Sequence, residues 1–129
     1  MKARFLIIAV CIVFLVKLSS CYRHHYESNG NMSISVKESE DEYRFSASFE
    51  RSKTRRIQDF IADATNNSLF DRENIDIDAT TTMDDNTKFY IRAYPGKIKI
   101  QLDKYENSEA SYERIKDMCE GIKEILRDH

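Results

Sequence analysis

The chain has 129 residues, a length that allows one folded domain and no more. Residues 1–20 contain three basic residues and no acidic residue. The remaining residues, 21–129, contain 17 Lys and Arg and 22 Asp and Glu, which gives this part a formal charge of −5. This acidic balance argues against a nucleic-acid-binding protein, whose affinity depends on cations that displace phosphate counterions.

The amino-terminal segment has the composition of a secretion signal. Residues 5–16 read FLIIAVCIVFLV, twelve apolar residues after a basic start. A helix of that length rises about 18 Å, too short for a hydrocarbon core of about 30 Å. The sequence therefore predicts a signal peptide over residues 1–20 rather than a transmembrane helix, although Lys17 follows the apolar run unusually closely.

Residues 18–21, LSSC, resemble the lipobox of bacterial lipoproteins, in which small residues precede a cysteine. The resemblance covers the first 21 residues only. It implies a diacylglycerol on Cys21, cleavage before it and acylation of the new amino terminus, so that the membrane itself is a partner. It also implies anchoring in the cell membrane or outer membrane, with the domain outside the cytoplasm. Ordinary secretory cleavage near Ser20 and an uncleaved anchor are the alternatives.

Residues 22–31, YRHHYESNGN, show no apolar periodicity. Together with the lipidated Cys21 they predict a flexible tether over 21–31, followed by a single domain over 32–129. The adjacent histidines His24 and His25 do not predict a metal site, because neighbours in a tether lack further ligands.

The domain begins with a predicted β-hairpin, because apolar residues occupy every second position in 32–36 and 43–49 and the charged turn ESEDE, residues 38–42, lies between them. Residues 52–66 change to helical spacing. Segments 75–79, 89–94 and 98–102 alternate again and predict a meander, with turns at 84–86 and at Pro95-Gly96.

Residues 108–127 carry a long apolar stripe and predict a second helix. Asn107 or Ser108 can cap it, and charged residues at its two ends suit the helix dipole. Gly121 lies inside it at a cost of about 1 kcal/mol relative to alanine, which indicates a close contact with the sheet. The order ββαβββα predicts an α+β fold, a two-layer sandwich with both helices on one face of a mostly antiparallel sheet.

The folded part offers no set of catalytic residues that the sequence can name. Cys119 lies in the apolar stripe without a histidine to activate it, so it is interpreted as packing. Asp76 and Asp78 form the one carboxylate pair that suits a hydrolase, although a solvated, charge-mixed sheet face explains them as well. No metal site and no cofactor are expected, since residues 71–82 lack the glycine of a calcium loop.

Two surfaces are candidates for binding. Four cations begin the first helix, where the dipole disfavours positive charge, and an anion or lipid headgroup would reconcile them: Arg51, Lys53, Arg55 and Arg56. Pairing with the acidic residues 38–42 is the alternative. Tyr90, Arg92 and Tyr94 share one side of a strand and belong to residue types that are enriched at binding hot spots, although packing between strands also explains them.

These features predict a non-catalytic binding or accessory protein of the bacterial cell envelope, with an envelope protein as its possible partner. One alternative is a small envelope hydrolase that uses carboxylates. The other is an inhibitor or immunity-type protein that blocks a secreted enzyme.

Overall fold

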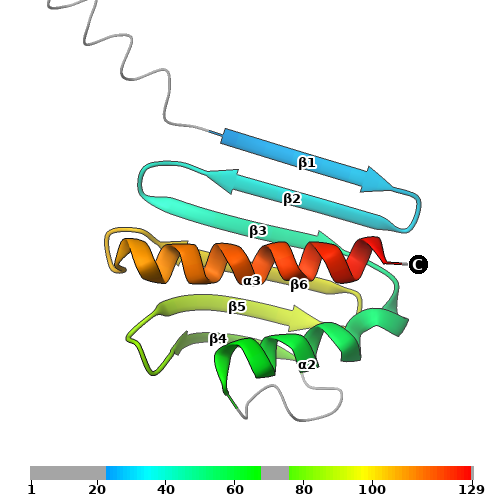
Figure 1. Cartoon of the computed structure of the whole chain (residues 1–129). Coiled ribbons are helices and arrows are strands. Elements are labelled where there is room, and N and C mark those ends of the chain that lie inside the picture. Colours follow the sequence, from blue (N-terminus) through cyan, green and yellow to red (C-terminus); the bar gives the residue numbers. More distant parts are fainter. Residues whose placement is uncertain (1–22, 68–75, 129) are drawn as a thin grey trace, which may run out of the picture.

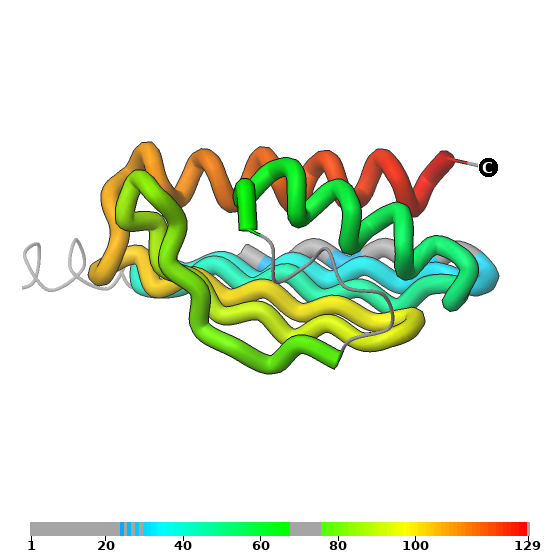
Figure 2. Tube along the Cα trace, turned by 90° about the horizontal axis from the view of Figure 1, so that it is seen from below, coloured from blue at the N-terminus to red at the C-terminus, as the bar shows by residue number. Residues whose placement is uncertain are grey.

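A computed structural model describes residues 23–67 and 76–128, which form one antiparallel sheet with two helices on one face (Figure 1). Figure 2 shows the two layers from the side. The predicted α+β class and two-layer arrangement are confirmed. The predicted signal peptide and the lipid site at Cys21 lie outside the described residues. In chain order the elements are β1 (Arg23–Asn29), β2 (Met32–Glu38), β3 (Glu42–Ser48), the short 3₁₀ helix η1 (Arg51–Lys53), α2 (Thr54–Thr65), β4 (Ile77–Thr82), β5 (Lys88–Tyr94), β6 (Lys97–Asp103) and α3 (Glu109–Arg127).

The six strands follow the order β1-β2-β3-β6-β5-β4, and each pair of neighbours is antiparallel. The chain thus builds a three-stranded meander and a helix twice, and the two meanders meet where β3 pairs with β6. The sequence shows no internal repeat, so this repetition is visible only in the structure.

The flexible tether predicted over residues 21–31 is wrong for residues 23–29, which form β1 at the edge of the sheet. The pairing with β2 runs from Arg23 opposite Glu38 to Asn29 opposite Met32, and Gly30, with a φ of 55°, turns the chain between them. The segment RHHYESN contains no aliphatic residue, so pairing through the backbone leaves no alternating pattern in the sequence. The order of elements is therefore βββαβββα.

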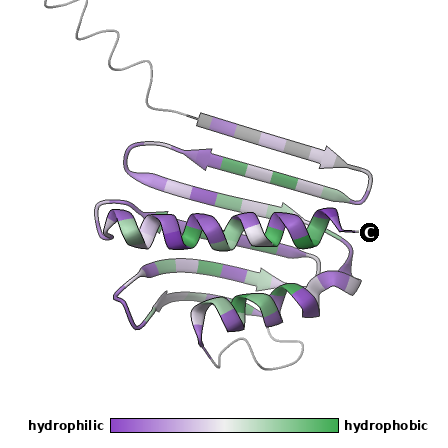
Figure 3. Ribbon diagram, viewed as in Figure 1, coloured by the Kyte–Doolittle hydropathy of each residue, from purple (hydrophilic) through white to green (hydrophobic). Residues whose placement is uncertain are grey.

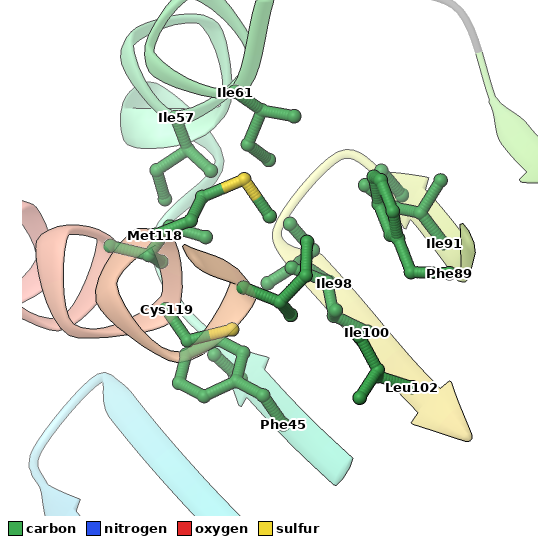
Figure 4. Packing of buried hydrophobic residues seen from close by; sticks show 14 of the residues in the cluster. Phe45, Ile57, Ile61, Phe89, Ile91, Ile98, Ile100, Leu102, Met118 and Cys119 are labelled. Carbon is green, nitrogen blue, oxygen red and sulfur yellow. The ribbon is translucent and has the colours of Figure 1, made fainter. Parts of the chain in front are cut away.

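The core lies between the helices and the sheet face that they cover. Hydrophobic and hydrophilic residues alternate along strands such as β5 (Figure 3), as a sheet with one buried face requires. Figure 4 shows how side chains of both helices meet those of the central strands; the labelled residues include Ile57, Ile61, Met118, Cys119, Phe45, Ile98 and Ile100.

The predicted caps and turns follow from local hydrogen bonds. The Ser108 hydroxyl accepts a hydrogen bond from the backbone N–H of Ser111 at 3.1 Å and caps α3 as predicted. Both predicted turns are present, and they contain residues with positive φ, Asn86 at 67° and Gly96 at 81°. The Gly96 N–H donates to the Thr54 hydroxyl at 3.0 Å, which joins this turn to the start of α2.

Gly121 marks a close contact, but the neighbour is the other helix and not the sheet. A Cβ atom at Gly121 would lie 2.3 Å from Cζ of Phe60 on α2, far inside van der Waals contact. The missing side chain therefore lets the Phe60 ring pack directly against the backbone of α3.

We expect Gly121→Ala to lower the free energy of unfolding by about 1–2 kcal/mol, because displacement of the Phe60 ring outweighs the gain in helix propensity. In a Phe60→Ala background the ring is gone, so the same substitution should raise stability by about 1 kcal/mol. Urea denaturation of the four proteins measures this reversal of sign. A Gly121→Ala substitution that stabilises both backgrounds equally would contradict the contact.

Candidate functional site

The sheet face opposite the helices is polar, and cross-strand pairing arranges its side chains in rows. Directly opposite residues on neighbouring antiparallel strands share a face. One row across the whole sheet consists of Tyr26, Ser35, Ser46, Lys99, Arg92 and Asp78. The adjacent row consists of Ser28, Ser33, Ser48, Lys97 and Tyr94.

Where these rows cross β2 and β3, four short side chains leave a shallow hollow of about 210 Å³. We call it the serine depression; its lining side chains on this face are Ser33, Ser35, Ser46, Ser48, Lys97, Lys99, Arg92 and Tyr94. On the β1 side, the depression is bordered by the longer side chains of Tyr26 and His24. The Ser33 hydroxyl donates to the Tyr26 hydroxyl at 3.4 Å, and His24 Nε2 lies 3.5 Å from the Ser35 hydroxyl.

The three residues predicted as a partner site on β5 share the outer face but have different neighbours. Arg92 and Tyr94 line the serine depression, and the Arg92 guanidinium lies 5.2 Å from the centroid of the Tyr94 ring in a cation–π contact. The Tyr90 hydroxyl instead donates to Asp78 Oδ1 at 2.7 Å, and this bond to a carboxylate raises the pKa of Tyr90. Sequence reasoning missed the serines, Lys97 and Lys99.

Charge is unevenly distributed along the outer face. At the end where β3 and β5 begin, Arg44 pairs with Glu42 at 2.6 Å and Lys88 pairs with Glu106 at 3.6 Å. In contrast, Lys97 and Lys99 have no carboxylate within ion-pair distance in the described parts of the chain. The depression therefore has a cationic rim on which Lys97 and Lys99 form no ion pair with the described residues.

The basic residues at the start of α2 have partners at the end of α3. Lys53 Nζ donates to the carbonyl oxygens of Leu126 and Asp128 at 3.1 and 2.7 Å, and Arg56 pairs with the Asp128 carboxylate at 3.2 Å. Arg55 lies 3.5 Å from the carboxylate of Asp59. The negative end of the α3 dipole thus accounts for cations at this position. Lys53 and Arg56 therefore pair with the end of α3 and not with residues 38–42, the alternative considered from the sequence. The predicted anion site stays a prediction.

The carboxylate pair considered for hydrolysis, Asp76 and Asp78, lies at the edge of the sheet that β4 forms. Asp76 precedes the edge strand β4 and Asp78 belongs to it, and both side chains are exposed. Neither residue lines the serine depression. Asp78 is engaged by the Tyr90 hydroxyl. An enclosed pair of carboxylates with separated acid and base roles is not formed here.

Cys119 is fully buried on α3, next to the hydroxyl of Tyr43 on β3. Burial raises the pKa of the Cys119 thiol, which keeps it protonated and unreactive. Burial also raises the pKa of Tyr43, whose buried hydroxyl has no hydrogen-bond partner of ordinary strength within the described residues. These groups form part of the core.

Comparison of the chain with protein-family models, with curated proteins and with solved structures found no match. Among residues 23–67 and 76–128, no helix is long and apolar enough to cross a bilayer. The same residues contain no group of three His, Cys, Asp or Glu side chains placed to hold a metal ion. The outer face of the sheet is therefore the candidate binding surface.

Proposed function

We propose that this protein is a non-catalytic binding module of the bacterial cell envelope and that the serine depression is its binding surface. The observation that carries the proposal is a sheet face left open by both helices, with short hydroxyl side chains beside two lysines that form no ion pair with residues 23–67 and 76–128. Arginine and tyrosine at its rim are residue types enriched in binding hot spots. The lipobox resemblance supports attachment through Cys21 and a domain outside the cytoplasm.

A binding role is favoured over hydrolysis by the positions of the carboxylates. Asp76 and Asp78 are exposed near the edge strand β4, whereas Arg92 and Tyr94 face the depression. A hydrolase needs an acid and a base that converge on one bond. No observation on the described residues favours that alternative.

We expect a photo-crosslinking side chain at Tyr26, an exposed aromatic position beside the serine depression, to form adducts with envelope components in living cells that make the full chain. The same probe at Glu113, exposed on α3 on the opposite side of the protein, should form far fewer. Combined Arg92→Ala and Tyr94→Ala substitutions should reduce the Tyr26 adducts at least about tenfold, because truncation of one hot-spot residue commonly costs more than 1 kcal/mol.

Lys88→Ala is the matched control, because it removes a cation from the same strand and face outside the depression. It should leave the adducts within about twofold of the parent, as expected for an exposed pair worth less than 1 kcal/mol. Equal adducts from Tyr26 and Glu113, or adducts indifferent to the Arg92 and Tyr94 substitutions, would show that the depression is not the binding surface.

A further inference from the structure

We propose that the serine depression binds an anionic polysaccharide, a chain of hydroxylated sugar rings that carry carboxylate, phosphate or sulfate groups. This inference rests on the proposed binding function and names the class of its ligand. Three properties of the depression support it: a cationic rim, a floor of hydroxyl groups, and tyrosines on both sides.

The rim supplies charge complementarity. Lys97, Lys99 and Arg92 lie in adjacent rows on β6 and β5, and the chain as a whole has a formal charge of −2. A cluster of cations on an acidic protein attracts anions to one place instead of the whole surface. Arginine can hold a carboxylate, phosphate or sulfate through two parallel hydrogen bonds, whereas lysine acts as a point charge.

The floor supplies hydrogen bonds that suit sugar hydroxyls. Each serine hydroxyl can donate one hydrogen bond and accept two, so it can pair with a sugar hydroxyl in either sense. Ser33 lies directly opposite Ser48, and Ser35 lies directly opposite Ser46. The four hydroxyl groups form a rectangle about 5 Å wide and about 7 Å long. In the next row Lys37 lies opposite Arg44 and continues the polar track along the strands.

The two sides supply surfaces for the less polar faces of sugar rings. Tyr94 is half-buried on the β5 side, and Tyr26, 60% exposed, stands on the β1 side. Tyrosine combines a large apolar ring with a polar end, so it suits a ligand that alternates C–H and O–H groups. A chain of sugars lying between them would contact both strands of the floor.

An acidic peptide fits this surface less well. A peptide gains affinity by adding to the free edge of a sheet, whereas β2 and β3 have strand partners on both sides. The depression also offers short polar side chains in place of an apolar pocket for a large anchoring residue. Single-stranded nucleic acid needs stacking platforms for successive bases along a positive groove. The floor of the depression between Tyr26 and Tyr94 instead carries serines, on which bases cannot stack.

The experiment is a calorimetric titration of the full chain in nonionic detergent with oligosaccharides and two other polyanions. The probes are a galacturonate hexamer, a sulfated glucose hexamer, neutral maltohexaose, a hexaglutamate peptide and the oligonucleotide dT6. We expect at least one anionic hexasaccharide to bind at least about tenfold more tightly than the neutral sugar, the peptide and dT6. Raising the salt concentration from about 0.1 to about 0.5 M should weaken this binding several-fold.

Two variants test the site in different ways. Lys97→Gln combined with Lys99→Gln removes charge from the rim of the depression and should lower affinity at least about tenfold. Ser46→Tyr fills the depression without changing charge, in a strand position that tolerates tyrosine, and should abolish binding. Lys88→Gln removes one cation from the same face and should change affinity less than about twofold.

The proposal is overturned if neither anionic sugar binds, or if hexaglutamate or dT6 binds as tightly. It is also overturned if Lys88→Gln weakens binding as much as the paired lysine substitutions, because attraction would then follow total charge. Adducts from Tyr26 in cells without binding of any anionic sugar would reject the polysaccharide and leave the binding module standing. Absence of adducts from Tyr26 in the otherwise unchanged protein would reject both.

Discussion

Replacement of Phe45 by alanine is expected to lower the free energy of unfolding by about 3–5 kcal/mol, the range for a large side chain removed from a closed core. Phe45 is fully buried on β3, directly opposite the fully buried Ile100 on β6. Among the strands of residues 23–67 and 76–128, this pair alone joins the two three-stranded meanders. A cavity here therefore weakens the junction between both halves of the fold.

Urea denaturation followed by circular dichroism measures the loss for the full chain. Ser46→Ala is the matched control, because Ser46 is the next residue of β3 and faces the open side of the sheet. Its effect should stay within about 0.5 kcal/mol. A loss below about 1 kcal/mol for Phe45→Ala would mean that the junction of the two meanders is not the centre of the cooperative core.

Stability is also expected to fall steeply in alkaline solution, because Cys119 and Tyr43 are buried in their protonated forms. In the unfolded chain these groups ionise near their ordinary pKa values of 9.0 and 10.0, whereas burial raises both pKa values far above these in the folded chain. Above pH 9 the unfolded state thus binds fewer protons, so rising pH favours unfolding. Each group contributes about 1.4 kcal/mol per pH unit, a combined loss of about 4 kcal/mol by about pH 11.

The measurement is the free energy of unfolding between about pH 7 and about pH 11 for the parent and for a Cys119→Ala, Tyr43→Phe double variant. The variant should show a much flatter dependence above pH 9, whatever its stability near neutrality. Tyr105→Phe alters an exposed tyrosine and should leave the slope unchanged. Equal slopes in parent and double variant would show that neither buried group governs the alkaline loss.

The parts of the fold that sequence reasoning predicted are those with local signals. Apolar periodicity distinguishes the helices from the strands because it reports which face of each element is buried. The start of α3 could be placed at Ser108 because a serine in that position satisfies a free backbone N–H. The turn at Gly96 was predictable for a similar reason, since glycine adopts positive φ without strain.

The parts that sequence reasoning missed depend on pairing between distant segments. β1 carries no apolar alternation, because an edge strand can be held by backbone hydrogen bonds alone. The serines at positions 33, 35, 46 and 48 are visible in the sequence, but their meeting with Lys97 and Lys99 follows from the pairing of β3 with β6. No sequence pattern within β3 or β6 predicts that these two strands pair with each other.

The position of β1 also sets how far the domain can reach from an anchor. Only Tyr22 separates Cys21 from the first residue of the strand, so on the proposal that Cys21 carries lipid, about 7 Å of chain at most joins bilayer to sheet. If β1 separated from β2, residues 22–31 would become a linker that could extend to about 35 Å. On that proposal, pairing of this edge strand determines whether the domain is held against the membrane or can move several nanometres from it.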